Sequence, residues 1–136
     1  RGTPGSRVIT MCSASALYGQ PELASYSATK AAVRSLTEAL DIEWRAQGIR
    51  EVDVLPLFVN TAMVTNEVSR MKTVQRLGVR LGPDDVAQAV WRLANQASGQ
   101  LPVHTFVGLQ TRLFALLSKL SPAFMNRWVT ARLAGY

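Results

Sequence analysis

The feature that most constrains the fold is a pair of short, β-prone apolar runs with one long helical pattern between them. The runs are residues 8–12 and 52–56, and the second ends in a proline. Between them, Ala, Leu and Trp recur at helical spacing over residues 22–47, and Gly48 follows. A strand, a helix and a strand in this order predict a βαβ crossover, which is right-handed and has parallel strands. Because the first run is apolar at successive positions, we expect a strand buried on both faces.

The chain downstream extends this pattern. Residues 61–81 are less regular and are predicted to be helical in part. Pro83, Asp84 and Asp85 then indicate a helix start, because a proline and carboxylates suit the first helical turn. That helix is expected to end near Ser98 and Gly99, and a third strand is expected over residues 103–107. The sequence therefore predicts an α/β fold with a parallel sheet of about three strands and flanking helices.

The C-terminal part has a different character. From Leu109 an apolar helical pattern runs to Leu120, breaks at Ser121 and Pro122, and resumes towards Leu133. We divide the chain on this basis into an α/β part at 1–108 and an amphipathic C-terminal helical segment at 109–136. Trp44, Trp91 and Trp128 lie at spacings typical of helical core positions.

Composition excludes several classes of site. A single Cys12 and a single His104 rule out a disulfide framework and a Cys/His zinc site, so no metal site is expected. We expect Cys12 in the core and His104 on or beside the last strand, and we expect neither residue to take part in catalysis. No apolar stretch approaches the roughly 20 residues of a membrane span. The net charge of +6 comes without a zinc finger, an RNA-binding aromatic motif or a Lys/Arg run, so we interpret it as solvated helix faces and expect no nucleic-acid partner.

Candidate catalytic residues lie in the first third of the chain. Tyr26 and Lys30 are four residues apart on the predicted helix, so they share one face. Ser13 lies thirteen residues before Tyr26, just after the first strand, where ligands bind in open α/β sheets. A phenol is a poor base at neutral pH, but an adjacent ammonium favours its ionised form. By itself such a pair is weak evidence, because an exposed Tyr-Lys pair without a function is the usual interpretation of this spacing, so the catalytic assignment depends on the surrounding sequence.

That context closely resembles the short-chain dehydrogenase/reductase family. The matching strings are VITMCSASA at residues 8–16 and YSATKAAV at residues 26–33. PLFVNT at residues 56–61 is similar to the family's Pro-Gly-x-x-x-Thr segment after the next strand. The resemblance extends from about Gly5 to Gly99 and weakens after Thr61, and the C-terminal helices resemble only some members. It implies the C-terminal half of a doubly wound, Rossmann-type domain.

The resemblance also implies roles. Ser13 would hydrogen-bond the substrate carbonyl or hydroxyl, and Tyr26 would exchange the proton. Lys30 would favour the ionised form of Tyr26 and bind the ribose of a nicotinamide cofactor, NAD or NADP. The Val59 backbone and Thr61 would hold the nicotinamide carboxamide. The expected activity is an oxidoreductase that interconverts a carbonyl and an alcohol by hydride transfer.

Two alternatives to these assignments remain open. Ser15 competes with Ser13 for the substrate-binding role, but its eleven-residue spacing to Tyr26 fits the family less well. Leu57 replaces the family's Gly, and the chain contains no Gly-rich phosphate loop. The alternative function is therefore a non-catalytic oligomerisation or binding module, or an inactive fragment, and we expect the chain alone to be neither active nor a stable monomer.

Partners and location are expectations of the same kind. The Ala-rich helix at 22–47 leaves apolar surface beyond its cofactor face, so a homo-oligomer is expected. Residues 109–136 combine an apolar face with charges that are all positive. One interpretation is that they pack over a substrate pocket or against a neighbouring subunit. The other is that they lie on an anionic membrane or bind a lipid-like carbonyl substrate. We expect a cytoplasmic protein, with a peripheral membrane association as the alternative location.

Overall fold

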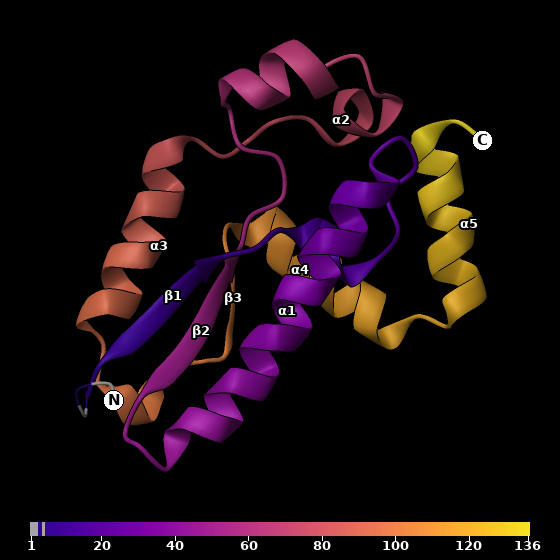
Figure 1. Ribbon diagram of the computed structural model, residues 1–136. Coiled ribbons are helices and arrows are strands. Elements are labelled where there is room, and N and C mark those ends of the chain that lie inside the picture. Colours follow the sequence, from indigo (N-terminus) through magenta and orange to yellow (C-terminus); the bar gives the residue numbers. More distant parts are fainter. Residues whose placement is uncertain (1–2, 4) are drawn as a thin grey trace.

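The centre of the molecule is a three-stranded parallel sheet. The computed structural model describes Thr3 and residues 5–136. Strands β1 (Arg7–Met11), β2 (Arg50–Leu55) and β3 (His104–Phe106) lie in that order across the sheet (Figure 1). The register places Ile9 beside Val52 and Val54 beside Thr105. The predicted α/β fold, a parallel sheet of about three strands with flanking helices, is confirmed.

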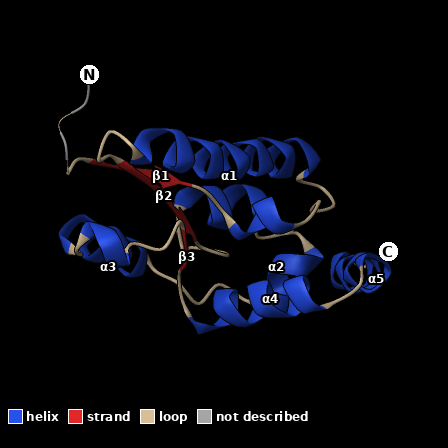
Figure 2. Cartoon of the chain, turned by 90° about the horizontal axis from the view of Figure 1, so that it is seen from below, coloured by secondary structure: helices blue, strands red, loops and turns tan. Residues whose placement is uncertain are grey.

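Helix α1 (Ala24–Arg45) connects β1 to β2 and covers one face of the sheet (Figure 2). It is two residues shorter at each end than the predicted span of 22–47. At its start Glu22 has a φ of 69°, which is not helical, so the helix begins only after it. At its end Gly48 has a φ of 72°, a left-handed conformation that glycine adopts readily and that turns the chain towards β2.

Helix α3 (Pro83–Asn95) covers the opposite face of the sheet (Figure 2). Pro83 opens the helix as predicted, and Asp85 accepts a hydrogen bond from the Gly82 backbone N–H at 2.7 Å. The helix ends earlier than expected, and a separate 3-10 turn follows at Ser98–Gln100. The main hydrophobic core lies between β2 and α3 and consists of Val52, Val54, Ala89, Leu93, Leu101 and Val107.

The two crossover connections have opposite hands. The chain steps in one direction across the sheet, from β1 to β2 to β3, but α1 and α3 lie on opposite faces. A right-handed first crossover, as predicted, makes the β2–α3–β3 connection left-handed, which is rare. This second connection is not a simple strand-helix-strand unit, because a long segment precedes α3.

That segment follows β2 and lies over the carboxyl end of the sheet. It contains a π-helical turn at Val64–Val68 and the short helix α2 (Lys72–Leu77), so the prediction of partial helix is confirmed. Its apolar side chains form a second, smaller cluster of Val64, Val68, Met71 and Val74, against which Leu23 and Phe58 pack. Leu23 immediately precedes α1, so this cluster ties the segment to the start of that helix.

Strand β1 corrects the expectation of burial on both faces. Val8 and Met11 are 44% and 46% exposed, whereas β2 is buried from Glu51 to Leu55. The difference follows from position, because β1 is an edge strand of this sheet and β2 has a neighbour on each side. An apolar run therefore identified the strand correctly but not its place in the sheet.

Two helices complete the chain. Helix α4 (Leu109–Leu120) follows β3, and α5 (Ala123–Ala134) follows the predicted break at Ser121 and Pro122. α5 packs against α2. No helix among the described residues is long and apolar enough to cross a membrane.

The tryptophans correct a further expectation. Trp91 on α3 and Trp128 on α5 are 71% and 67% exposed, and only Trp44 is half-buried. The prediction that all three occupy core positions is therefore wrong for Trp91 and Trp128. Helical spacing shows that residues share a face, but it does not show that another element covers that face.

Candidate active site

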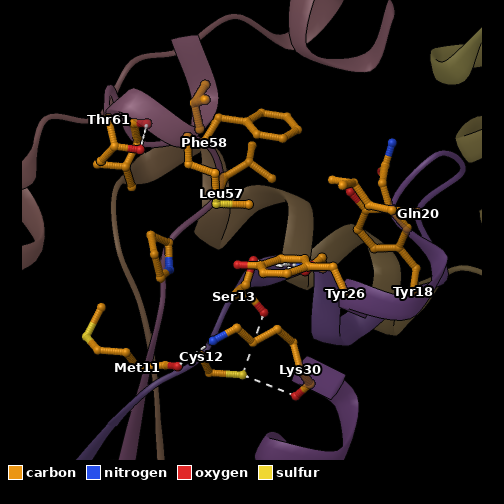
Figure 3. A pocket seen from close by; sticks show the side chains of 16 residues that line it. Met11, Cys12, Ser13, Tyr18, Gln20, Tyr26, Lys30, Leu57, Phe58 and Thr61 are labelled. Atoms are coloured by element: carbon orange, nitrogen blue, oxygen red, sulfur yellow. Dashed lines mark hydrogen bonds between the residues drawn. The ribbon is translucent and has the colours of Figure 1, made fainter. Parts of the chain in front are cut away.

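Three chain segments converge on one pocket at the carboxyl ends of β1 and β2. They are the loop after β1, the first turns of α1 and the segment after β2, and the pocket between them has a volume of about 260 Å³. Every residue predicted for the site lines this pocket: Ser13, Tyr26, Lys30, Val59 and Thr61. Figure 3 shows the side chains of its lining residues. Parallel strands end at a common edge of the sheet, which brings segments distant in sequence together.

Ser13 is held in the first of these segments by its neighbour Ser15. Ser13 caps a 3-10 turn at Ala14–Leu17 and accepts a hydrogen bond from the Ser15 backbone N–H at 3.2 Å. The Ser15 hydroxyl also donates to the Ser13 Oγ at 3.0 Å. Both serines line the pocket, but Ser15 uses its polar hydrogens on Ser13, while the Ser13 hydroxyl hydrogen remains available to a bound molecule.

Tyr26 and Lys30 lie one helical turn apart on α1. The Lys30 ammonium is 5.6 Å from the centroid of the Tyr26 ring and donates a hydrogen bond to the Met11 carbonyl at 2.9 Å. This hydrogen bond fixes the lysine to the end of β1. In Figure 3 the Tyr26 ring extends into the pocket with its hydroxyl end towards Ser13 and Leu57. The pair therefore presents a phenol and a cation to the same space.

The third segment contributes backbone and hydroxyl groups. The Thr61 hydroxyl donates to the Val59 carbonyl at 3.4 Å, and Val59 forms an isolated parallel bridge with Leu81. Leu57, which replaces a glycine in the family pattern, also lines the pocket. Among the described residues only Glu22 is a non-glycine with positive φ, so the turn at Leu57 does not need the freedom of glycine.

Among the lining residues that the sequence did not identify, two carry polar groups. Tyr18 forms part of the wall and contacts Phe114 of α4, with the ring centroids 5.0 Å apart and the ring planes tilted by 57°. Burial raises the pKa of Tyr18 to about 12. Gln20 is 2% exposed, and its side-chain amide donates to the Thr73 hydroxyl at 2.8 Å. The loop position of Tyr18 was the only signal in the sequence, and nothing local connects Gln20 to a threonine far along the chain.

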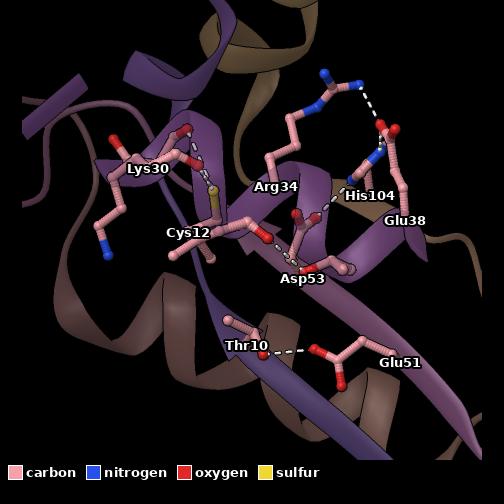
Figure 4. Close-up of polar contacts among 11 residues, drawn as sticks. Thr10, Cys12, Lys30, Arg34, Glu38, Glu51, Asp53 and His104 are labelled. Carbon is pink, nitrogen blue, oxygen red and sulfur yellow. Dashed lines mark hydrogen bonds and ion pairs between the residues drawn. The ribbon is translucent and has the colours of Figure 1, made fainter. Parts of the chain in front are cut away.

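Polar contacts lie beneath the pocket, between β1, β2 and α1 (Figure 4). The Cys12 thiol donates to the Lys30 carbonyl at 3.4 Å, and burial raises its pKa, which fits the expected core role. Asp53 is fully buried and lies 2.9 Å from Nδ1 of His104, whose Nε2 lies 2.8 Å from Glu38. His104 is on β3 as predicted and does not line the pocket.

Comparison with known proteins gives a consistent result. The family model described as short chain dehydrogenase matches residues 2–72. The uncharacterized oxidoreductase YgfF of Escherichia coli is 36% identical over 107 residues, which cover 71% of this chain and 42% of that protein. The 3-oxoacyl-[acyl-carrier-protein] reductase FabG of Rickettsia prowazekii is 38% identical over 97 residues, which cover 68% of this chain and 40% of that protein. The chain thus spans less than half the length of these relatives.

Solved structures agree on the fold. A short chain dehydrogenase from Burkholderia cenocepacia in complex with NADP has a TM-score of 0.73 at 22% identity, over 95% of this chain and 49% of that one. A 3-ketoacyl-(acyl-carrier-protein) reductase from Brucella melitensis, complexed with NADH, has a TM-score of 0.62 at 30% identity, over 74% of this chain and 41% of that one. With the family model matching more than half of its residues, the chain belongs to the short-chain dehydrogenase family.

Proposed function

We propose that residues 1–108 supply the catalytic part of an NAD(P)-dependent oxidoreductase that interconverts a carbonyl and an alcohol. The supporting observation is that Ser13, Tyr26, Lys30, Val59 and Thr61 line one pocket although they come from three separate segments. The chain contains no Gly-rich phosphate loop, so the activity is proposed for the intact protein. The pocket wall includes apolar residues such as Leu57 and Phe58, which suits a small or lipid-like substrate.

Ser13 orients the substrate in this proposal. Its oxygen accepts two hydrogen bonds from Ser15, so its own hydrogen points away from those donors and can be given to a substrate oxygen. Ser15 is then a positioning residue rather than the competitor for the same role. A fixed donor at the reacting oxygen aligns the carbonyl before any bond changes.

Tyr26 moves the proton. Its hydroxyl would give a proton to the carbonyl oxygen during reduction and take it back from the alcohol during oxidation. The negative charge that develops on the phenol oxygen is stabilised by the Lys30 ammonium one helical turn away. Since Lys30 is anchored to the Met11 carbonyl, this charge stays in place through the reaction.

The residues present fit a nicotinamide cofactor. Lys30 uses one hydrogen on Met11, which leaves two N–H donors for ribose hydroxyls. The Val59 backbone and the Thr61 hydroxyl, whose contact with Val59 is long at 3.4 Å, would hold a carboxamide. When bound, the cofactor supplies or accepts the hydride. Relatives in complex with NADP or NADH support this assignment.

The decisive test is Tyr26→Phe in the intact protein, with Tyr136→Phe, at a 79% exposed tyrosine, as the matched control. We expect Tyr26→Phe to lower kcat/KM by about a hundredfold or more, as loss of a general acid does, while NADH or NADPH fluorescence still reports binding. Near wild-type turnover by Tyr26→Phe would remove the proton-transfer role. Failure of the wild-type protein to bind either cofactor would favour a non-catalytic binding module.

We also propose a homo-oligomer that uses the outer face of α1. Leu36 and Ile42 on this helix are 56% and 74% exposed, and Ala32 and Ala39 are exposed beside them. An apolar helical face of this kind suits an isologous interface. Light scattering should show an oligomer that Leu36→Glu dissociates, and a monomeric wild type at micromolar concentration would contradict the proposal.

A further inference from the structure

Helix α5 has its large apolar side chains on the outside. Phe124, Met125 and Trp128 are 71%, 43% and 67% exposed. The side that faces the rest of the molecule contains Asn126, which donates a hydrogen bond to the Ser118 carbonyl at 2.9 Å, and the buried Ala134. A helix that packs only against its own chain shows the reverse arrangement. The exposed face of α5 therefore lacks the partner that its composition requires.

The end of α4 continues this apolar surface. Leu116, Leu117 and Leu120 are 53%, 54% and 72% exposed, and they lead directly into the turn before α5. We call the surface formed by the end of α4 and the start of α5 the α4–α5 corner. Its residues are Leu116, Leu117, Lys119, Leu120, Phe124, Arg127 and Trp128. In Figure 1 the turn between the two helices lies at the periphery of the molecule.

The charges of the segment that forms the corner all have one sign. Residues 100–136 contain Arg112, Lys119, Arg127 and Arg132 and no Asp or Glu. The ion pairs among the described side chains involve none of these four. Arg112 and Lys119 also line a groove between α1, β3 and α4, which has a volume of about 570 Å³. An apolar surface that carries Lys119 and Arg127 and has no acidic residue in its own segment complements a partner that is both apolar and anionic.

We propose that the α4–α5 corner docks on an anionic phospholipid membrane. A second copy of the chain fits the corner less well, because an isologous contact would bring two copies of the same cationic surface together, and residues 100–136 contain no acid to compensate Lys119 and Arg127. A strand that paired with the exposed edge strand β1 would not cover it either, since β1 and helix α5 lie on opposite sides of the molecule in Figure 1. Helices that lie in a membrane interface bury Leu, Phe and Trp at the boundary of the acyl chains and place Lys and Arg at the lipid headgroups.

The test is co-sedimentation of the intact protein with phosphatidylcholine vesicles, with and without phosphatidylglycerol. We expect binding only to the anionic vesicles at low salt, and release as salt rises through screening. Phe124→Ser/Trp128→Ser should abolish binding, while Trp91→Ser, which removes an equally exposed Trp on α3, should not change it. A blue shift of Trp128 fluorescence on binding would accompany the sedimentation.

The charges need their own pair of variants. Lys119→Gln/Arg127→Gln should weaken binding about tenfold or more, since each cation near an anionic surface contributes substantially. Arg70→Gln/Arg80→Gln lowers the net charge equally at exposed positions away from the corner and should leave binding nearly unchanged. No binding to anionic vesicles, equal effects of the two charge variants, or dissociation of an oligomer by Phe124→Ser/Trp128→Ser would each overturn the proposal. Because turnover is not the readout, these outcomes are independent of the proposed catalytic function.

Discussion

Replacing His104 tests the polar contacts that join α1 to the sheet. Both ring nitrogens of His104 lie within hydrogen-bond distance of a carboxylate, Asp53 at 2.9 Å and Glu38 at 2.8 Å. Because a carboxylate only accepts hydrogen bonds, both nitrogens must carry hydrogen, which makes the ring an imidazolium when both contacts form. The hydrogen bond that His104 donates to Asp53 raises the pKa of His104, against the opposing effect of burial.

The expected cost follows from the burial of Asp53. This carboxylate is 0% exposed, and its second oxygen has no partner among the described residues. His104→Ala removes the partner of the first oxygen and leaves a buried charge, which costs about 3 kcal/mol of unfolding free energy. Glu38→Gln is the control, because Glu38 is 47% exposed and its pair should contribute under about 1 kcal/mol.

The cost must also depend on pH. Because folding raises the pKa of His104, its protonation stabilises the folded state. This stabilisation is fully present at pH values below the unfolded-state pKa of about 6.5 and is lost as pH rises through the folded-state pKa. Urea unfolding of the intact protein should therefore show the largest effect of His104→Ala on the acidic side. The difference should shrink, but not vanish, on the alkaline side, where neutral His104 still donates to Asp53. A pH-independent cost, or one below about 1 kcal/mol, would refute this reasoning.

Two further substitutions probe other parts of the fold. Asp41→Asn should lower the free energy of unfolding by about 3–5 kcal/mol, because Asp41 is 1% exposed and accepts hydrogen bonds from Arg50 at 2.6 Å and from Arg45. These bonds hold the pKa of Asp41 below its ordinary value despite burial, so in urea unfolding the stabilisation by Asp41 should be present at neutral pH and lost as pH falls through the folded pKa. Gly108→Ala should destabilise more than Gly78→Ala in thermal melts, since both residues have positive φ but only at Gly108 would the new Cβ meet a side chain, Leu81 at 2.8 Å; equal losses would show that the side chain yields freely.

Local sequence patterns predicted the elements of this fold well. The parallel strands, the start of α3 at Pro83 and the break at Pro122 each depend on a few adjacent residues, and each is confirmed. The convergence of Ser13, Tyr26 and Lys30 was also predictable, because strand order and helix direction place them at one edge of the sheet.

Features that depend on distant partners were not predictable. The edge position of β1 and the exposure of Trp128 are decided by which elements lie beside them, and periodicity carries no such information. The contacts of Gln20 with Thr73 and of Asp53 with His104 join residues more than fifty positions apart. The left-handed second crossover runs against the general preference, so pattern alone predicts the opposite hand.

The two faces of β2 explain how the site is held in position. Val52 and Val54 face the apolar core with α3, while the buried carboxylates Glu51 and Asp53 alternate with them and make polar contacts on the other side. The fully buried residues of α1 are likewise polar: Ser27, Thr37 and Asp41. Of these three residues Asp41 bonds to the sheet, whereas Ser27 bonds to the Gln20 backbone and Thr37 to the Val33 carbonyl of its own helix.

Directional contacts nevertheless join α1 to the sheet at both of its ends. Hydrogen bonds weaken steeply with distance and angle, whereas apolar packing accommodates small shifts, so such contacts fix how far the helix lies along the strands. Asp41 with Arg50 sets one end of α1, and the Lys30 carbonyl with Cys12 sets the other, beside the pocket. These buried polar contacts carry a desolvation penalty. Since Tyr26 and Lys30 are on this helix, the same contacts hold the phenol and the ammonium at the end of β1.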